Sequence, residues 1–230
     1  MFLIMKIRLS ILLALAAFAV AQAQDKPFSF TIKAGASLSN TKFVNNGHRL
    51  TTLWAPSIFA GVGGGYAISP LLAIEADVLL LTKGHALNNV SVFTGEQIGS
   101  NRFGALHLDM PINLKAGLDI GPKLRLYAQV GPYLSLALKG RMWISSEDNS
   151  GIVTAMNCYP GNTTEGLDFG GAPHAALRRF DVGLDAGAGV VLASHYQLGL
   201  LYYHGLRNQA KPAGDVLKHR MLCLELGYRF

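Results

Sequence analysis

The fold is decided by the stretch from Leu106 to Leu118, which reads LHLDMPINLKAGL. Every even-numbered residue in this stretch is apolar, whereas its odd-numbered residues include Asp109, Asn113 and Lys115. Successive side chains of a β-strand point to opposite faces of the sheet. The alternation therefore predicts a strand with one apolar face and one polar face.

The same alternation occurs in eight segments of the chain. Across them the even-numbered face is apolar, and Arg220, at a strand end, is its only charged residue. The odd-numbered face mixes charged and amide side chains, Lys139 among them, with glycine. We predict eight strands over these segments: Phe28–Leu38, Trp54–Tyr66, Leu71–Thr82, Phe103–Asp119, Lys123–Lys139, Phe180–Leu192, Tyr196–Leu206 and Arg220–Phe230.

Two architectures use such strands, and they differ in the face that is turned outwards. A soluble barrel or sandwich buries the apolar face, whereas a membrane barrel shows it to lipid and encloses the polar face. Glycines on the polar face, such as Gly61 and Gly63, suit a narrow lumen. Aromatic residues near strand ends, such as Trp54 and Tyr196, suit bilayer interfaces. We therefore predict an all-β fold, an eight-stranded antiparallel up-and-down transmembrane β-barrel with a polar lumen and an apolar exterior.

The connections between the predicted strands alternate in length. Residues 67–70, 120–122 and 193–195 form tight turns, whereas 39–53, 83–102, 140–179 and 207–219 form long polar loops. Outer-membrane barrels have short periplasmic turns and long outer loops. We therefore expect an outer-membrane protein of a Gram-negative cell, with periplasmic termini and extracellular long loops.

The first residues have the pattern of a secretory signal peptide. Lys6 and Arg8 precede an apolar run that ends in Ala21-Gln22-Ala23, which is an A-x-A cleavage site. We predict a cleaved signal peptide over residues 1–23 and one barrel domain over residues 24–230. The mature chain would have 18 basic and 14 acidic residues, a net charge of +4 without clusters, so no nucleic-acid partner is expected.

Five phrases carry a resemblance to a known family, and they follow one another along nearly the whole mature chain. The chain resembles the PorT-like outer-membrane β-barrel proteins, which are often labelled porin family. The resemblance implies the fold and the location, and some members of the family are tied to protein secretion. The ending at Phe230 resembles the signal that the barrel-assembly machinery recognises. The five phrases are Ile32–Ser39, Leu108–Lys115, Val130–Leu134, Asp181–Leu184 and Leu226–Phe230.

The charged residues of the odd-numbered face form the main candidate site. A turn centred near Gly121 would bring Lys115 close to Tyr127 and Asn113 close to Gln129, and Asp77 could approach Asp109. These residues form either an ion path or a plug of paired charges, and the narrow lumen of an eight-stranded barrel favours the plug. The predicted lumen network consists of Lys33, Glu75, Asp77, Asp109, Lys115, Arg125, Asp181, Asp185, Glu225 and Arg229.

The third long loop is the candidate partner surface, because exposed loops on a rigid scaffold often carry recognition. Its aromatic residues Trp143, Tyr159 and Phe169 form the predicted contact surface. The alternative is that the ends of this loop simply extend the strands above the membrane.

No catalytic, cofactor or metal site is predicted. The histidines are scattered, and no Ser, His and Asp spacing can be assembled into a triad. The acidic residues of the third loop match neither calcium nor zinc spacing. The sequence does not indicate whether Cys158 and Cys223 pair.

We therefore expect a non-enzymatic outer-membrane protein with a structural, binding or secretion-associated role through its long loops and a mostly blocked lumen. Its expected partners are membrane lipid, the barrel-assembly machinery at Phe230 and a protein at the loops. A narrow porin-like channel for ions or small solutes is the alternative function, and a lipid-modifying surface enzyme is the third.

Overall fold

The computed structural model describes residues 27–45, 47–90, 97–146, 161–167, 169 and 177–230. The predicted signal peptide lies outside these residues. No helix among them is long and apolar enough to cross a bilayer. Ten strands are present: β1 Phe28–Asn45, β2 His48–Leu50, β3 Ala55–Ala67, β4 Leu72–Val90, β5 Gln97–Gly121, β6 Leu124–Ser146, β7 Gly161–Leu167, β8 Phe180–Leu192, β9 Tyr196–Gly205 and β10 Val216–Arg229.

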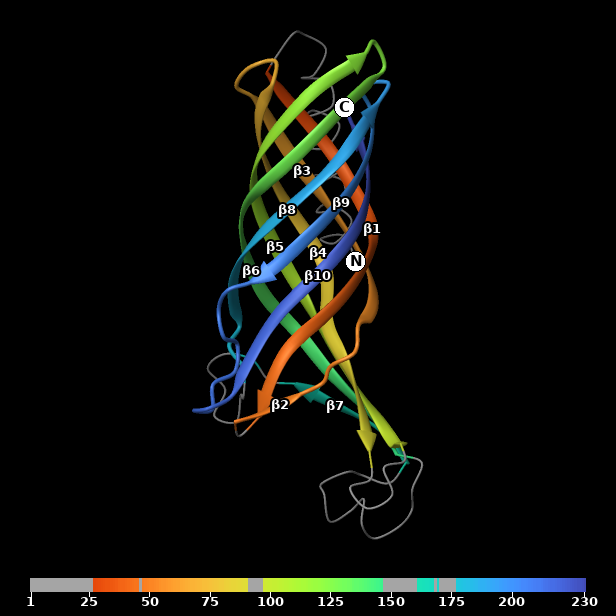
Figure 1. Cartoon of the computed structure of the whole chain (residues 1–230), viewed down its shortest axis with the longest axis vertical. Coiled ribbons are helices and arrows are strands. Elements are labelled where there is room, and N and C mark those ends of the chain that lie inside the picture. The colour runs from red at the N-terminus through yellow and green to blue at the C-terminus, as the bar shows by residue number, and fades with distance from the viewer. Residues whose placement is uncertain (1–26, 46, 91–96, 147–160, 168, 170–176) are drawn as a thin grey trace, which may run out of the picture.

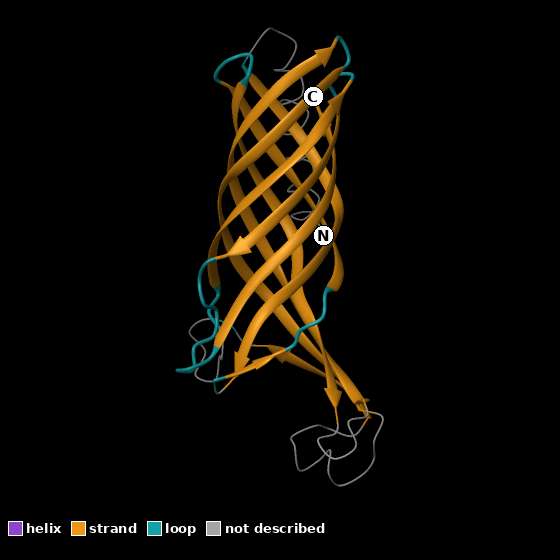
Figure 2. Ribbon diagram, in the orientation of Figure 1, coloured by secondary structure: helices purple, strands orange, loops and turns teal. Residues whose placement is uncertain are grey.

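All ten strands belong to one antiparallel sheet that forms an up-and-down β-barrel (Figure 1). Its strand order is β10-β9-β8-β6-β5-β4-β3-β1-β2, and the short β7 pairs with β6. β10 also pairs with β1, from Thr31 opposite Arg229 to Val44 opposite Val216. The long strands wind around a common axis with a pronounced tilt, and teal segments in Figure 2 mark the described loops and turns between strands.

The two ends of the barrel differ in their connections. Short turns join β3 to β4, β5 to β6 and β8 to β9 at one end, which we call the turn end. The carboxyl terminus also lies there (Figure 1). The opposite end, which we call the loop end, carries β2, β7 and the longer connections. This alternation of short and long connections follows the prediction.

The strands extend further towards the loop end than predicted. β8 has the predicted bounds, but β1 continues to Asn45, β4 to Val90 and β6 to Ser146, and β5 begins at Gln97. Much of the chain predicted as loop at 83–102 is therefore strand, and β2 and β7 lie within other predicted loops. An apolar outer face is needed only where the wall contacts lipid. Beyond that point the strands can keep pairing through their backbone hydrogen bonds in water, so they run further than the apolar pattern indicates.

The wall of the barrel is apolar outside, and the barrel encloses six carboxylates. Leu126 and Leu224 are 40% and 51% exposed on the outer wall, whereas Asp109 and Glu225 are 0% and 1% exposed inside. A soluble barrel would place these side chains the other way round. The predicted orientation of the two faces is confirmed for these residues.

Lys139 is an exception to the predicted parity. We predicted an inward side chain, but Lys139 is exposed on the outside. Lys139 pairs with Leu106 and Ala137 pairs with His107, so Leu138 is an extra residue in β6. Such a β-bulge reverses the alternation beyond it. The inward position beyond the bulge is taken by Gly140.

Candidate functional site

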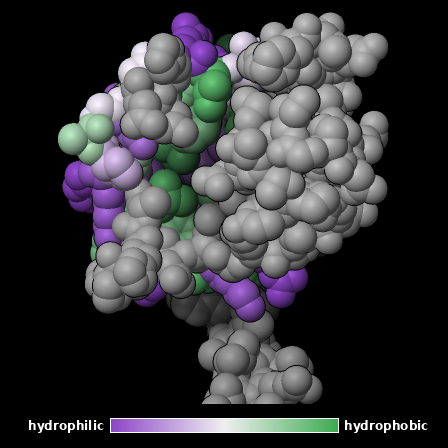
Figure 3. Space-filling view, turned by 90° about the horizontal axis from the view of Figure 1, so that it is seen from below, coloured by the Kyte–Doolittle hydropathy of each residue, from purple (hydrophilic) through white to green (hydrophobic). Residues whose placement is uncertain are grey.

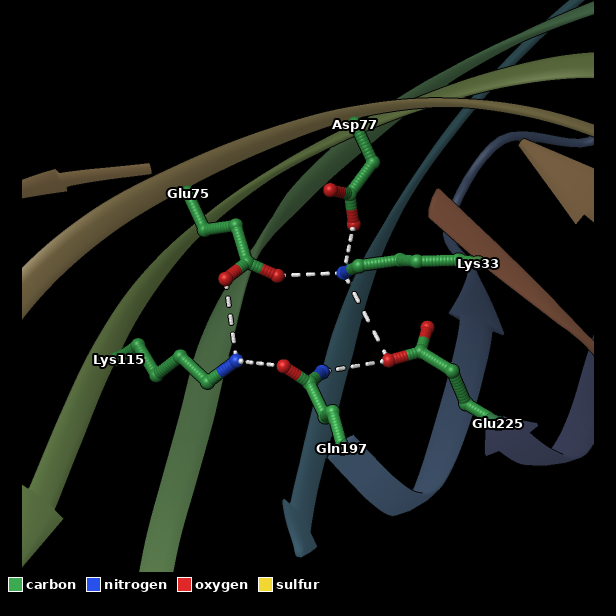
Figure 4. A network of polar contacts seen from close by, with 6 residues as sticks. All are labelled: Lys33, Glu75, Asp77, Lys115, Gln197 and Glu225. Atoms are coloured by element: carbon green, nitrogen blue, oxygen red, sulfur yellow. Dashed lines mark hydrogen bonds and ion pairs between the residues drawn. The ribbon is translucent and has the colours of Figure 1, made fainter. Parts of the chain in front are cut away.

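Lys33 of β1 organises a buried ionic network in the half of the barrel nearer the turn end (Figure 4). Its ammonium donates to Glu75 and, at 2.7 Å, to Asp77, both on β4. Glu225 of β10 lies 3.6 Å from the same nitrogen. Three carboxylates therefore surround one fully buried cation, as a buried charge requires.

Lys115 of β5 extends this network towards the turn end. Its ammonium donates to Glu75 and to the amide oxygen of Gln197, each at 3.0 Å. It also lies 3.9 Å from the centroid of the Tyr127 ring, which is cation–π geometry. Gln197 in turn donates to Glu225 at 2.8 Å. The hydrogen bonds thus link β1, β4, β5, β9 and β10 across the lumen.

An apolar layer fills the middle of the barrel, which the predicted polar lumen did not include. Tyr133 and Tyr203 contact each other with ring centroids 5.4 Å apart. The residues of this layer are buried and form one cluster: Phe59, Leu79, Leu81, Tyr133, Leu201, Tyr203, Met221 and Cys223. Cys223 is a free thiol there, and Cys158 lies outside the described residues.

A second polar layer lies between the apolar layer and the loop end. Lys83 pairs with Asp109 at 2.7 Å and donates to Ser135 at 3.1 Å. His107 lies 3.0 Å from the same serine hydroxyl. Further towards the loop end, Thr41 contacts His85 at 3.1 Å and His219 at 3.2 Å, and His219 contacts Gln209 at 2.9 Å.

The prediction missed most of this second layer. Lys83 and His85 lie beyond the predicted end of their strand, and Gln209 lies in a predicted loop. The contact of His107 with Ser135 depends on the pairing of β5 with β6, which brings together residues 28 positions apart. The inward parity of His107 and of Ser135 was the available indication. This histidine and serine are buried, at 0% and 1% exposure, so the pair has no exposed face for a substrate.

The predicted lumen residues are brought together only in part. Lys115 joins the network with a side chain that is 11% exposed, whereas Arg125 and Arg229 are half-buried near the turn end. Arg125 pairs there with Asp119 at 2.9 Å rather than with an interior carboxylate. The remaining seven are buried: Lys33, Glu75, Asp77, Asp109, Asp181, Asp185 and Glu225.

The pairing within the network differs from the predicted contacts. Lys115 contacts Tyr127 as expected, but its register partner is Gln129. Asp77 does not join Asp109, because each binds a different lysine, Lys33 and Lys83 respectively.

The interior holds more carboxylates than ammonium groups. Among the described residues, six buried carboxylates face the three ammonium groups of Lys33, Lys83 and Lys115. Asp185 is 1% exposed and belongs to none of the described ion pairs. The amides of Asn113 and Gln129 approach it, yet neither carboxylate oxygen has a hydrogen bond of ordinary geometry within the described residues.

The predicted loop contact surface changes in one respect. The side chain of Trp143 and the whole of Tyr159 lie outside the described residues. Phe169 is only 5% exposed, so it is not a surface residue as predicted. It belongs to an apolar cluster at the loop end, formed by Phe103, Ala105, Ala137, Phe169, Leu177, Ala210 and Leu217.

A cavity of about 530 Å³ lies at the turn end. Its lining runs from turn residues such as Pro122 and His195 to Tyr127, Lys115 and Glu75 of the ionic network. The cavity therefore reaches the Lys115 end of the network. Among the described residues, no group of three or more His, Cys, Asp or Glu side chains is arranged to hold a metal ion.

The family comparison agrees with this architecture. A family model described as outer membrane protein beta-barrel domain matches residues 10–230. No curated protein matches the chain.

Several solved structures are similar to this chain. The attachment invasion locus protein Ail of Yersinia pestis, in complex with the heparin analogue sucrose octasulfate, is 14% identical with a TM-score of 0.42, covering 88% of this chain and 99% of that one. Neisserial surface protein A is 10% identical with a TM-score of 0.41, and the match covers 89% of this chain and 98% of that one. The outer membrane protein OprG of Pseudomonas aeruginosa is 10% identical with a TM-score of 0.40, and the match covers 89% of this chain and 97% of that one.

Proposed function

The chain belongs to the outer membrane protein β-barrel domain family, and from this we propose that it is a non-conducting barrel that acts through its loop end. The observation that carries the proposal is the filled interior. The Lys33 network, the apolar layer around Tyr133 and the Lys83 layer follow one another along the axis, and their central side chains are buried. A lumen of about eight strands is just wide enough for side chains to fill.

We propose that eight strands cross the membrane. β1, β3, β4, β5, β6, β8, β9 and β10 each pair with two others of this set, and β1 with β10 joins the first to the last. β2 and β7 are short and pair at the loop end with β1 and β6. They would lie outside the bilayer.

We propose that the turn end faces the periplasm and the loop end faces outwards. Short turns and a carboxyl-terminal strand at one end support this orientation. Residues 1–23 would be the cleaved signal peptide, as their charge and apolar pattern indicates. Phe230, at the turn end, would then be available in the periplasm to the barrel-assembly machinery.

Within the family we propose a place among the PorT-like members, on the five phrases from Ile32 to Phe230. A binding or secretion-associated role at the loop end would fit that place. Trp143 and Tyr159 of the third loop remain the proposed partner surface, without Phe169.

A narrow channel is the second candidate, and the cavity at the turn end is the observation that favours it. Conduction would require the path to continue past Lys115, Lys33 and the buried rings of Tyr133 and Tyr203. Both rings are buried in the apolar layer. The packing thus supports the blocked lumen over the channel.

Conductance in planar bilayers separates these two functions. We expect the refolded chain to give no steady unitary currents, and heat-modifiable migration on a gel would verify that the barrel is folded. Steady unitary currents from folded protein would overturn the blocked lumen and establish the channel.

We propose no enzymatic reaction. The Ser135 and His107 pair is enclosed by the barrel wall, and catalysis needs a nucleophile that a substrate can reach. Lipid A mass spectra from cells with and without the protein test this, and a mass shift that depends on the protein would restore the enzyme hypothesis.

A further inference from the structure

Basic residues collect on the outer rim of the loop end, where the apolar wall stops. Lys42 of β1 is exposed, and Lys218 and Arg220 of β10 are half-exposed. Nearer the turn end, four residues from Lys42 and from Lys218, the outward residues Leu38 and Leu222 are 44% and 38% exposed and belong to the apolar wall. Figure 3 looks onto the loop end and shows hydrophilic residues along the rim of the described part.

Lys42 and Lys218 are direct register partners. Like charges directly opposite each other in an antiparallel pair are destabilising. Arg220 lies two residues from Lys218 and holds its guanidinium 5.6 Å from the exposed Trp54 ring. Two lysines and an arginine therefore share one outer face beside an aromatic residue of the type that favours the membrane interface.

A second basic group lies on β5 and β6. Lys139 and Arg141 face outwards because of the bulge at Leu138, and Arg102 is exposed on the neighbouring strand. The bulge thus places two cations on the rim that an unbroken alternation would turn inwards.

These six cations have no carboxylate partner among the described side chains. None of them takes part in a described ion pair. Asp215 is the single acidic residue at the loop end whose side chain is both described and outside the barrel interior. At the turn end, by contrast, Arg125 is paired with Asp119.

We propose that the loop-end rim is a binding surface for the phosphate groups of anionic lipids in the surrounding leaflet, centred on Lys42 and Lys218. Lysine and arginine bind phosphate through charge-assisted hydrogen bonds, and basic residues beside a bilayer are attracted to anionic headgroups. A phosphate between the two lysines would remove their mutual repulsion. The apolar wall that begins at Leu38 and Leu222, beyond Asn40 and Arg220 towards the turn end, would contact the acyl chains of the same lipid.

The test uses the full chain refolded in phosphatidylcholine vesicles that contain lipid A. After extraction in detergent, the lipid A retained by the barrel is quantified by mass spectrometry. We expect the variant Lys42→Gln/Lys218→Gln to lose binding by about fivefold for each lysine removed. Two controls are matched to it: Lys42→Arg/Lys218→Arg keeps the charge, and Lys123→Gln removes an exposed lysine at the turn end. Both should retain lipid A as the wild type does.

Equal retention by the glutamine variant and the wild type would overturn the proposal, as would an equal loss in Lys123→Gln. Displacement of lipid A by inorganic phosphate at millimolar concentration would assign the site to a free anion instead. Lys42 and Lys123 are exposed and Lys218 is partly exposed, so folding should be unchanged, which heat-modifiable migration verifies. If lipid A binding fails this test, the proposal of a blocked lumen still stands, because conductance in planar bilayers tests it separately.

Discussion

Lys33 illustrates how single residues stabilise the interior of the barrel. Its ammonium is fully buried and lies between Glu75, Asp77 and Glu225. Transfer of a charge out of water costs several kcal/mol, and only close partners offset that cost. The carboxylates of the network depend on this lysine in the same way.

We predict that Lys33→Met lowers the free energy of unfolding by about 3–5 kcal/mol, because it leaves buried carboxylates without their cation. Urea unfolding in phosphatidylcholine vesicles, followed by tryptophan fluorescence, measures the change. Lys123→Met, at an exposed position, is the control and should match the wild type. A Lys33→Met protein as stable as this control would show that the network contributes little.

Asp185 is the opposite case, since its buried carboxylate forms no ion pair with a described side chain. We predict that Asp185→Asn leaves the free energy of unfolding at neutral pH unchanged or raises it by about 1–2 kcal/mol, because a neutral amide costs less to bury. The same urea titration measures it. A loss as large as that of Lys33→Met would mean that the carboxylate has a stabilising cation.

At the level of the strand, the sequence predicts the face on which each side chain lies, but not the residue that lies opposite it on the neighbouring strand. The faces of β8 follow the sequence, and its bounds agree with the prediction. The expected pairing of β5 with β6 was shifted by two residues, because the turn lies at Pro122 and Lys123 rather than around Gly121 and the ladder is irregular between Asp119 and Gly121. A shift of two keeps every side chain on its face. The sequence therefore indicated which residues lie inside but not which of them pair.

The bulge in β6 shows where the parity rule fails. Leu138 and Lys139 are consecutive and both exposed. Nothing in the local sequence marks the extra residue, since it depends on how β5 and β6 twist together. Lys83 and His85 were missed for a different reason. The apolar pattern of β4 indicates where its lipid-facing part ends, but the hydrogen bonds of β4 to its neighbours continue beyond that point.

Glycines on the inner face make room for large interior side chains, and Gly183 is the clearest example. A Cβ at this position would lie 2.4 Å from the Tyr133 ring and 2.3 Å from the backbone oxygen of His204. We predict that Gly183→Ala lowers the free energy of unfolding by about 1–3 kcal/mol through overpacking. Urea unfolding in vesicles measures the loss.

Gly64 provides the matched control, because a Cβ there would meet nothing within 4 Å. Gly64→Ala should be neutral or slightly stabilising, since alanine also loses less backbone entropy on folding. Equal effects of Gly183→Ala and Gly64→Ala would contradict the packing of Tyr133 over Gly183.

At the scale of the whole molecule, the barrel combines an apolar wall, a layered interior and two unlike ends. Two buried polar layers alternate with two apolar clusters along the axis, so charge and hydrophobic packing both fill the lumen. The turn end has a cavity and a paired arginine, whereas the loop end has an apolar cluster inside and rim cations that form no ion pair with any described side chain. This difference between the two ends suits a protein that meets different surroundings on the two sides of a membrane.

The assignment of this barrel to a membrane requires that the leucine-rich face contacts lipid. Spin labels attached to single cysteines at Leu224 and Leu126, with Cys158 and Cys223 replaced by serine, test that requirement in phosphatidylcholine vesicles. We predict that both labels collide more with oxygen, which dissolves in the bilayer, than with a water-soluble nickel chelate, and that a label at Lys123 shows the reverse. Labels at Leu224 and Leu126 that are shielded from both reagents would place these side chains inside the barrel and contradict the account.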